Sequence, residues 1–198
     1  MNPLYDDFPS TVVLDGVERE IVTDFRDWLR FYDMLRDPEG TNAEKVQVML
    51  SFYLDPLPVS AYARAHKPLL RFFRRKDMIR SPFVSECETD PEEDGGEMAP
   101  QKPLFDYMFD APYIISGFWQ DYGLNLMDLR LQMHWWQFGI LLDGLSEKTE
   151  FKQRVMYRNT NTAGIKDVKE RQRIERIQRA IAIPMPAPTD EEMGAMFW

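Results

Sequence analysis

Two apolar stripes on one predicted helix constrain the fold more than any other feature of the sequence. Apolar side chains recur twice at helical spacing between residues 127 and 142: one stripe is Leu131, Trp135, Phe138 and Leu142, and the other is Leu129, Met133, Trp136 and Ile140. An offset of two residues turns a helix by about 200°, so the stripes should face opposite sides. Burying one large apolar side chain contributes about 1.5 to 3 kcal/mol, so we expect both stripes to be covered.

The sequence leaves two explanations open for this two-sided helix. In the first, the helix is central within its own fold, and neighbouring elements cover both faces. In the second, one stripe is held for another polypeptide, either as a helix in a groove or as an oligomer contact. Under the second explanation the candidate partner-binding residues are Leu129, Met133, Trp136 and Ile140.

Turn and capping signals predict a hairpin followed by helices. Asp15-Gly16 supplies the positive φ angles of a two-residue hairpin turn, and residues 41–44 (Thr-Asn-Ala-Glu) have the spacing of a capping box. Pro68 lacks a backbone donor and predicts a break near His66, within the helical stretch that begins at Ser60. Besides that stretch, the predicted elements are a hairpin over 12–22 and helices over 25–35, 41–53, 110–123, 127–142, 149–157 and 165–181.

The fold class predicted from this order is mostly α (α+β), with a small N-terminal β-hairpin followed by a bundle of about six or seven helices. Residues 1–80 and 104–184 form two helical parts that we expect to pack into one globular unit. The segment 81–103 between them holds seven acidic residues and four prolines, which predicts a flexible acidic linker. Residues 185–198 are predicted to be a disordered tail.

Helical spacing also assigns inward faces to two further helices. Asp110 is the expected cap of the helix over 110–123. Its expected inward residues are Ile114, Ile115, Phe118, Trp119 and Tyr122. In the last helix, the expected inward residues are Val168, Ile174, Ile177 and Ile181.

Residue types that carry catalysis or bind metals are scarce. The chain has two histidines and one cysteine, and it lacks a phosphate-cradling glycine loop and a nucleophile elbow. His134 is interpreted as a polar ring at a helix interface, and Cys87 lies between glutamates that disfavour its thiolate. A single cysteine favours a reducing compartment. We therefore expect a protein that is not an enzyme and that binds no metal and no cofactor.

The charge distribution bears on the choice of partner. A net charge of -9 argues against binding nucleic acid through bulk electrostatics. Basic residues nevertheless gather in residues 61–80 and 151–181, and Arg64, Arg71 and Arg74 would share a stripe on a continuous helix, which makes them further candidate partner-binding residues. The alternative is a solvated or internally paired face. No apolar run is long enough for a membrane span, and we expect no cleaved signal peptide.

Several blocks in order along the chain resemble the bacteriophage gene-product-fifteen family. They are residues 23–31 (TDFRDWLRF), 110–114 (DAPYI), 122–126 (YGLNL), 134–138 (HWWQF), 143–145 (DGL), 151–158 (FKQRVMYR), 165–167 (IKD) and the basic helix that ends at Pro184. The similarity extends over roughly residues 17–184. The sequence departs from the family's pattern at Pro68 and in the length of the acidic segment 81–103.

This resemblance implies a protein of long-tailed phages and prophages, encoded beside the tail-tube and tape-measure genes. It implies a non-catalytic tail assembly chaperone that binds the helical tape-measure protein and keeps it soluble in the host cytoplasm. Further expected partners are the tail-tube protein and other copies of the chain. Met- and Trp-rich helices offer adaptable apolar faces for such a client, and acidic segments favour solubility. Two alternatives are a minor structural component retained in the virion tail and a small nucleic-acid-binding regulator.

Overall fold

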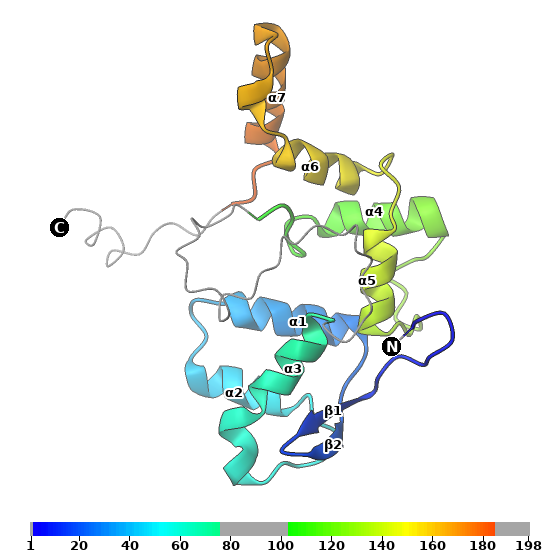
Figure 1. The fold of residues 1–198 in the computed structure, drawn as a ribbon, viewed down its shortest axis with the longest axis vertical. Coiled ribbons are helices and arrows are strands. Elements are labelled where there is room, and N and C mark those ends of the chain that lie inside the picture. The colour runs from blue at the N-terminus through cyan, green and yellow to red at the C-terminus, as the bar shows by residue number, and fades with distance from the viewer. Residues whose placement is uncertain (1, 76–102, 185–198) are drawn as a thin grey trace, which may run out of the picture. The chain divides into compact units, whose positions relative to one another are not determined.

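The computed structural model describes residues 2–75 and 103–184 of the chain (Figure 1). Cys87, the tail 185–198 and all but the last residue of the acidic segment 81–103 lie outside the described residues. The described residues are mostly helical and contain one two-stranded antiparallel hairpin near the N-terminus. The predicted fold class is therefore confirmed.

Contacts divide the chain into two units. Among the described residues, the first unit contains 2–75 and 124–144, and the second contains 103–123 and 145–184. The segment 124–144 thus belongs with the N-terminal residues, although its position along the chain predicts that it belongs to the second helical part. The packing of the two helical parts into one globular unit stays a prediction.

The hairpin forms where the Asp-Gly turn predicts it. Strand β1 (Thr11–Leu14) pairs with strand β2 (Val17–Glu20), and Leu14 lies opposite Val17. The turn residues Asp15 and Gly16 have φ angles of 52° and 78°, the left-handed values that a tight hairpin turn requires. Val12 and Leu14 face the core and are buried, whereas Val13 between them is exposed.

The first two helices of the first unit begin at the predicted signals, although the second ends at Leu50 and not at the expected residue 53. Asp24 caps α1 (Phe25–Arg36), and the capping box of Thr41 and Glu44 opens α2 (Asn42–Leu50). The stretch after residue 58 is split into the 3₁₀ helix η1 (Val59–Arg64) and α3 (His66–Phe73). Pro68 lies in the first turn of α3, where a backbone donor has no helical acceptor. The break near His66 is thus confirmed.

An aromatic core joins these elements to α5 (Trp135–Asp143). The ring of Trp28 lies 4.9 Å from the rings of both Phe52 and Phe72. The starts of α1 and α5 are tied by two backbone hydrogen bonds, from Phe25 N–H to the Met133 carbonyl (3.0 Å) and from Trp135 N–H to the Thr23 carbonyl (2.8 Å). These contacts explain why residues 124–144 belong to the first unit.

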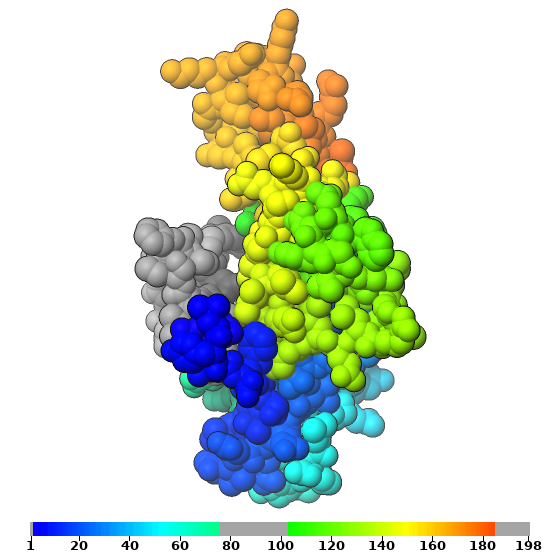
Figure 2. Space-filling model, turned by 90° about the vertical axis from the view of Figure 1, so that its right-hand side faces the viewer, coloured from blue at the N-terminus to red at the C-terminus, as the bar shows by residue number. Residues whose placement is uncertain are grey.

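The second unit contains α4 (Ala111–Tyr122), α6 (Glu150–Asn159), the 3₁₀ helix η2 (Thr162–Gly164) and α7 (Val168–Ala180). Gln178 donates two hydrogen bonds of 2.8 Å, to the carbonyls of Tyr157 and Thr160, and so joins α7 to the end of α6. Most other side chains of α7 are polar, and Figure 2 shows long side chains of this part of the chain (orange) projecting from the surface.

Two inward assignments in this unit are wrong. Trp119 is exposed because α4 buries the stripe of Ile114, Gly117 and Phe118, where the missing side chain of Gly117 leaves room for Leu145. Val168 is exposed because it precedes Ile174 by six residues, which places it about 120° away on the helix.

Candidate interaction surfaces

Helix α5 begins at Trp135, so the prediction of a helix over 127–142 is wrong over its first half. The side chains of Asn125 and Asp128 each accept a hydrogen bond of 3.0 Å from a backbone N–H two residues ahead. Such local bonds compete with helical bonds, so these residues form turns. The Nδ1 atom of His134 then caps α5 by accepting the backbone N–H of Trp136 at 3.0 Å.

The members of both predicted stripes from Met133 onward are buried or half-buried. Trp135 and Trp136 are both buried, and their indole N–H groups donate to the carbonyls of Phe73 and Phe72, each at 2.9 Å. Met133 is also buried, and Ile140 is half-buried. Met133 and Trp136 are therefore not available as an exposed partner stripe. Of the two explanations, a helix central within its own fold is the correct one.

Leu129, the remaining member of that stripe, lies in solvent. It belongs to residues 125–131, here called the Arg26 loop, which precede α5 in the first unit. Leu129 is 88% exposed and Met127 is 67% exposed. An isolated exposed leucine is ordinary in a soluble protein, so the exposure alone does not mark a site. What distinguishes this loop is how firmly its backbone is held.

One guanidinium group holds the whole loop. Arg26 of α1 donates to the carbonyls of Leu131 (2.7 Å), Leu126 (3.2 Å) and Asp128 (2.7 Å). Its side chain is only 20% exposed, and its guanidinium lies 4.6 Å from the ring centre of Phe25. Charge-assisted hydrogen bonds are about twice as strong as neutral ones. The loop is therefore a fixed backbone that presents two large apolar side chains outward.

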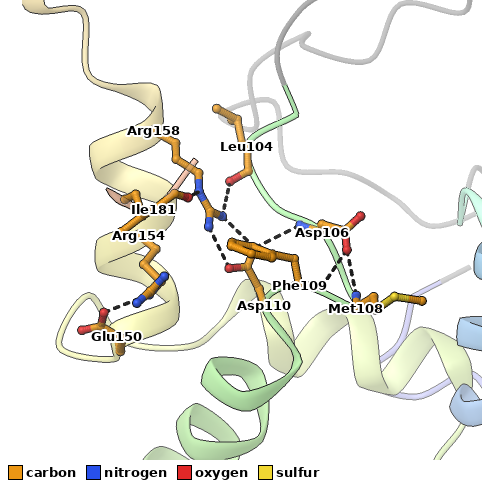
Figure 3. A network of polar contacts seen from close by, with 9 residues as sticks. All are labelled: Leu104, Asp106, Met108, Phe109, Asp110, Glu150, Arg154, Arg158 and Ile181. Atoms are coloured by element: carbon orange, nitrogen blue, oxygen red, sulfur yellow. Dashed lines mark hydrogen bonds and ion pairs between the residues drawn. The ribbon is translucent and has the colours of Figure 1, made fainter. Parts of the chain in front are cut away.

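A second arginine organises residues 104–110, here called the Arg158 segment, in the second unit (Figure 3). Arg158 of α6 forms a two-pronged ion pair with Asp110, with N–O distances of 2.6 Å and 2.9 Å. It also donates to the carbonyls of Leu104 (3.0 Å) and Ile181 (2.8 Å). The side chains of Arg158 and Asp110 are 6% and 0% exposed. One buried ion pair thus joins this segment to α6 and to the end of α7.

The two acidic residues of the Arg158 segment complete its conformation. Asp106 accepts hydrogen bonds from the backbone N–H groups of Met108 (2.9 Å) and Phe109 (2.8 Å). Asp110 holds the N-cap position of α4 but makes no capping hydrogen bond, because its carboxylate accepts Arg158 and the N–H of Asp106 instead. The expected capping role of Asp110 is therefore corrected to an ion-pair role.

The Arg158 segment also presents apolar side chains outward. Met108 is 68% exposed, and Leu104 and Phe109 are exposed to a smaller degree. The Phe109 ring centre lies 5.8 Å from the Arg158 guanidinium. Each unit thus has a segment that a buried or partly buried arginine fixes, and each segment carries solvent-facing Met, Leu or Phe side chains. Sequence reasoning identified Leu129 but missed Met127, Leu104, Met108 and Phe109.

The basic residues do not form the continuous stripe that the sequence suggests. Arg64 lies in η1 and is separated from α3 by the break at Ala65. It pairs with Asp15 through hydrogen bonds of 2.9 Å and 2.8 Å, which lower the pKa of the Asp15 carboxyl. Arg71 is exposed on α3, and Arg74 is exposed at the C-cap of the same helix. Partner binding by these three arginines stays a prediction.

His134 is a structural residue in the described part of the chain. Its Nε2 atom lies 3.0 Å from the Pro9 carbonyl, and its ring stacks on Phe8 at 5.0 Å. Because Nδ1 accepts the cap hydrogen bond, these contacts fit the neutral ring with the proton on Nε2. Burial lowers the pKa of His134, which also favours the neutral form. The interpretation as a polar ring at a helix interface is confirmed.

Residues 2–75 and 103–184 contain no group of three or more His, Cys, Asp or Glu side chains placed to hold a metal ion. Among the helices of the same residues, none combines the length and the apolar character that a membrane span requires.

Comparison with known proteins adds an assignment that the geometry alone does not give. Neither the curated proteins nor the solved structures give a significant match to this chain. The family model described as Bacteriophage Gp15 protein matches residues 4–183, which is nearly the whole sequence. This match supports a structural or assembly role in a phage. The chain belongs to the bacteriophage Gp15 protein family.

Proposed function

We propose that the chain is a non-catalytic tail assembly chaperone of a long-tailed phage. In this role it binds the helical tape-measure protein and keeps it soluble in the host cytoplasm while the tail is built. The observation that carries the proposal is the Arg26 loop, which holds Met127 and Leu129 in solvent on a fixed backbone. The family match supports the phage context.

The physical basis for binding is the Arg26 loop and not the two apolar stripes of the predicted helix over 127–142. Burying Met127 and Leu129 against an apolar client would contribute about 3 to 6 kcal/mol before the costs of association. Because Arg26 already fixes the backbone, little of that free energy is lost in ordering the loop. Methionine adapts to irregular apolar surfaces, which suits a client with many similar helical segments.

The Arg158 segment supplies a second contact of the same kind. Leu104, Met108 and Phe109 are exposed on it. Several weak apolar contacts per copy, and several copies along one client, would raise the overall affinity through multivalency. We therefore also propose that more than one copy binds each tape-measure chain, with the tail-tube protein as a further partner.

Co-expression with the tape-measure protein of the same phage tests this function. We expect the wild-type chain to increase the soluble fraction of the tape-measure protein and to co-purify with it. The double variant Met127→Ser, Leu129→Ser should fold but lose most of this effect. Val168→Ser is the matched control, since Val168 is exposed on α7 but lies outside both arginine-held segments. If solubility and co-purification do not depend on the chain, the proposal is wrong.

The second candidate is a minor structural component that stays in the virion tail. The firm anchoring of both segments favours it, because a fixed surface suits a permanent joint as well as a transient complex. Mass spectrometry of purified virions separates the two candidates. A chaperone should be absent from virions, whereas a structural component should be present in stoichiometric amounts.

A further inference from the structure

The outer edge of β1 has backbone groups that face away from its partner strand. Ile21 N–H donates to the Ser10 carbonyl at 2.9 Å, which marks Ser10 and Ile21 as a hydrogen-bonded pair. Pairs alternate along an antiparallel ladder, so Thr11 and Val13 direct their N–H and C=O groups to the outer edge. Strand β1 carries no charge and no proline, the usual protections of an edge.

A groove follows this edge. It has a volume of about 450 Å³ and lies between β1 and α3. Its lining from β1 is Thr11, Val12 and Val13, and its lining from α3 is Lys67, Pro68, Arg71 and Phe72. The two cationic residues lie one helical turn apart on α3. Lys67 forms no ion pair with any residue that the structure describes, whereas nearby Arg64 pairs with Asp15.

We propose that this groove binds an extended acidic segment of a partner polypeptide, which adds to the outer edge of β1 as a third strand. The backbone of Thr11 and Val13 would pair with the incoming strand, as in other cases of strand addition. A carboxylate on one face of that strand would meet Lys67 across the groove. This site is separate from the arginine-held segments, so it does not depend on the proposed chaperone function.

The charge of the groove distinguishes this partner from a second copy of the chain. Two copies paired edge to edge through β1 would bring the Lys67 side chains of both copies close together. Like charges placed in this way disfavour the pairing. An acidic strand instead gains both the backbone hydrogen bonds and the attraction to Lys67.

Nuclear magnetic resonance with the full-length, ¹⁵N-labelled protein tests the proposal. The probe is a capped hexapeptide in which glutamate and valine alternate, and its counterpart carries lysine in place of glutamate. We expect the glutamate peptide to shift the amide signals of residues 11–13 and 67–72 and to slow hydrogen exchange at Val13. The lysine peptide should leave these signals unchanged. Equal effects of both peptides, or no effect at these residues, would overturn the proposal.

Two variants probe the backbone and the charge separately. Val13→Pro removes an outward N–H without breaking a bond to β2, so the hairpin should persist while peptide affinity falls about tenfold. Val13→Thr keeps the N–H and is its control. Lys67→Glu should weaken binding as well, whereas Lys148→Glu in the second unit should not. If Val13→Pro fails to fold, the comparison of Lys67→Glu with Lys148→Glu still decides the outcome.

A single-stranded oligothymidine completes the test. It should leave residues 11–13 and 67–72 unaffected. Shifts there with oligothymidine, and none with the glutamate peptide, would identify the groove as a nucleic-acid site and contradict the proposal.

Discussion

Replacing Arg158 with methionine should destabilise the second unit more than any other single arginine change there. The substitution keeps most of the apolar stem but leaves the Asp110 carboxylate, which is 0% exposed, without its partner. The carbonyls of Leu104 and Ile181 also lose a donor. Removing one partner of a buried ion pair costs about 3 to 5 kcal/mol. That is a large part of a domain's net stability of about 5 to 15 kcal/mol.

Urea unfolding followed by circular dichroism measures this loss. With a urea m-value of about 2 kcal/mol per molar, the expected loss lowers the unfolding midpoint by about 1.5 to 2.5 M. Arg173→Met is the matched control, because the Arg173 and Glu170 side chains are 63% and 45% exposed and such pairs contribute at most about 1 kcal/mol. Adding Asp110→Asn to Arg158→Met should recover part of the loss, since the unpaired buried charge is then removed.

The reasoning would be refuted if Arg158→Met cost less than about 1 kcal/mol. It would also be refuted if the losses of Asp110→Asn and Arg158→Met simply added in the double variant. Either result would mean that the two side chains are not coupled through a buried pair.

Two further predictions concern residues of the first unit. Burial lowers the pKa of His134 below its usual value of about 6.5, so the unfolded chain binds the proton more readily than the folded chain. The free energy of unfolding should therefore be highest above about pH 6.5 and should decrease as the pH falls below that value. His134→Asn, which keeps a capping acceptor, should remove this dependence in urea melts at several pH values. Trp136→Ala should cost about 3 to 5 kcal/mol because Trp136 is buried, whereas Leu129→Ala should change stability by less than about 0.5 kcal/mol. Thermal melts that show equal losses for these two variants would contradict the assignment of one to the core and the other to the surface.

Local chemistry explains what the sequence could predict. The Asp15-Gly16 turn, the capping box at Thr41 and the break before Pro68 each depend on residues within four positions of one another. Periodicity failed where such local chemistry opposed it. Asn125 and Asp128 form turns and His134 caps α5, so the apolar spacing from residue 127 does not continue a helix. The turn-forming side chains before His134 were the available signal.

The arginine-held segments could not be predicted because their contacts are remote along the chain. Arg26 reaches the Leu126 carbonyl across 100 positions, and Arg158 reaches Asp110 across 48. No spacing rule links such pairs, and each partner alone is an ordinary charged residue. The exposure of Met127 and Met108 could not be predicted for the same reason. It depends on how the backbone is fixed and not on the residues next to them in the sequence.

Site-specific photo-crosslinking at position 129 tests the central claim most directly. A benzophenone amino acid replaces Leu129 in cells that produce the phage tail, and crosslinked products are identified by mass spectrometry. If the Arg26 loop binds the client, adducts with the tape-measure protein should form at position 129 and not at the control position 168, which is exposed on α7. Equal adducts at both positions, or none with the tape-measure protein at position 129, would contradict the account.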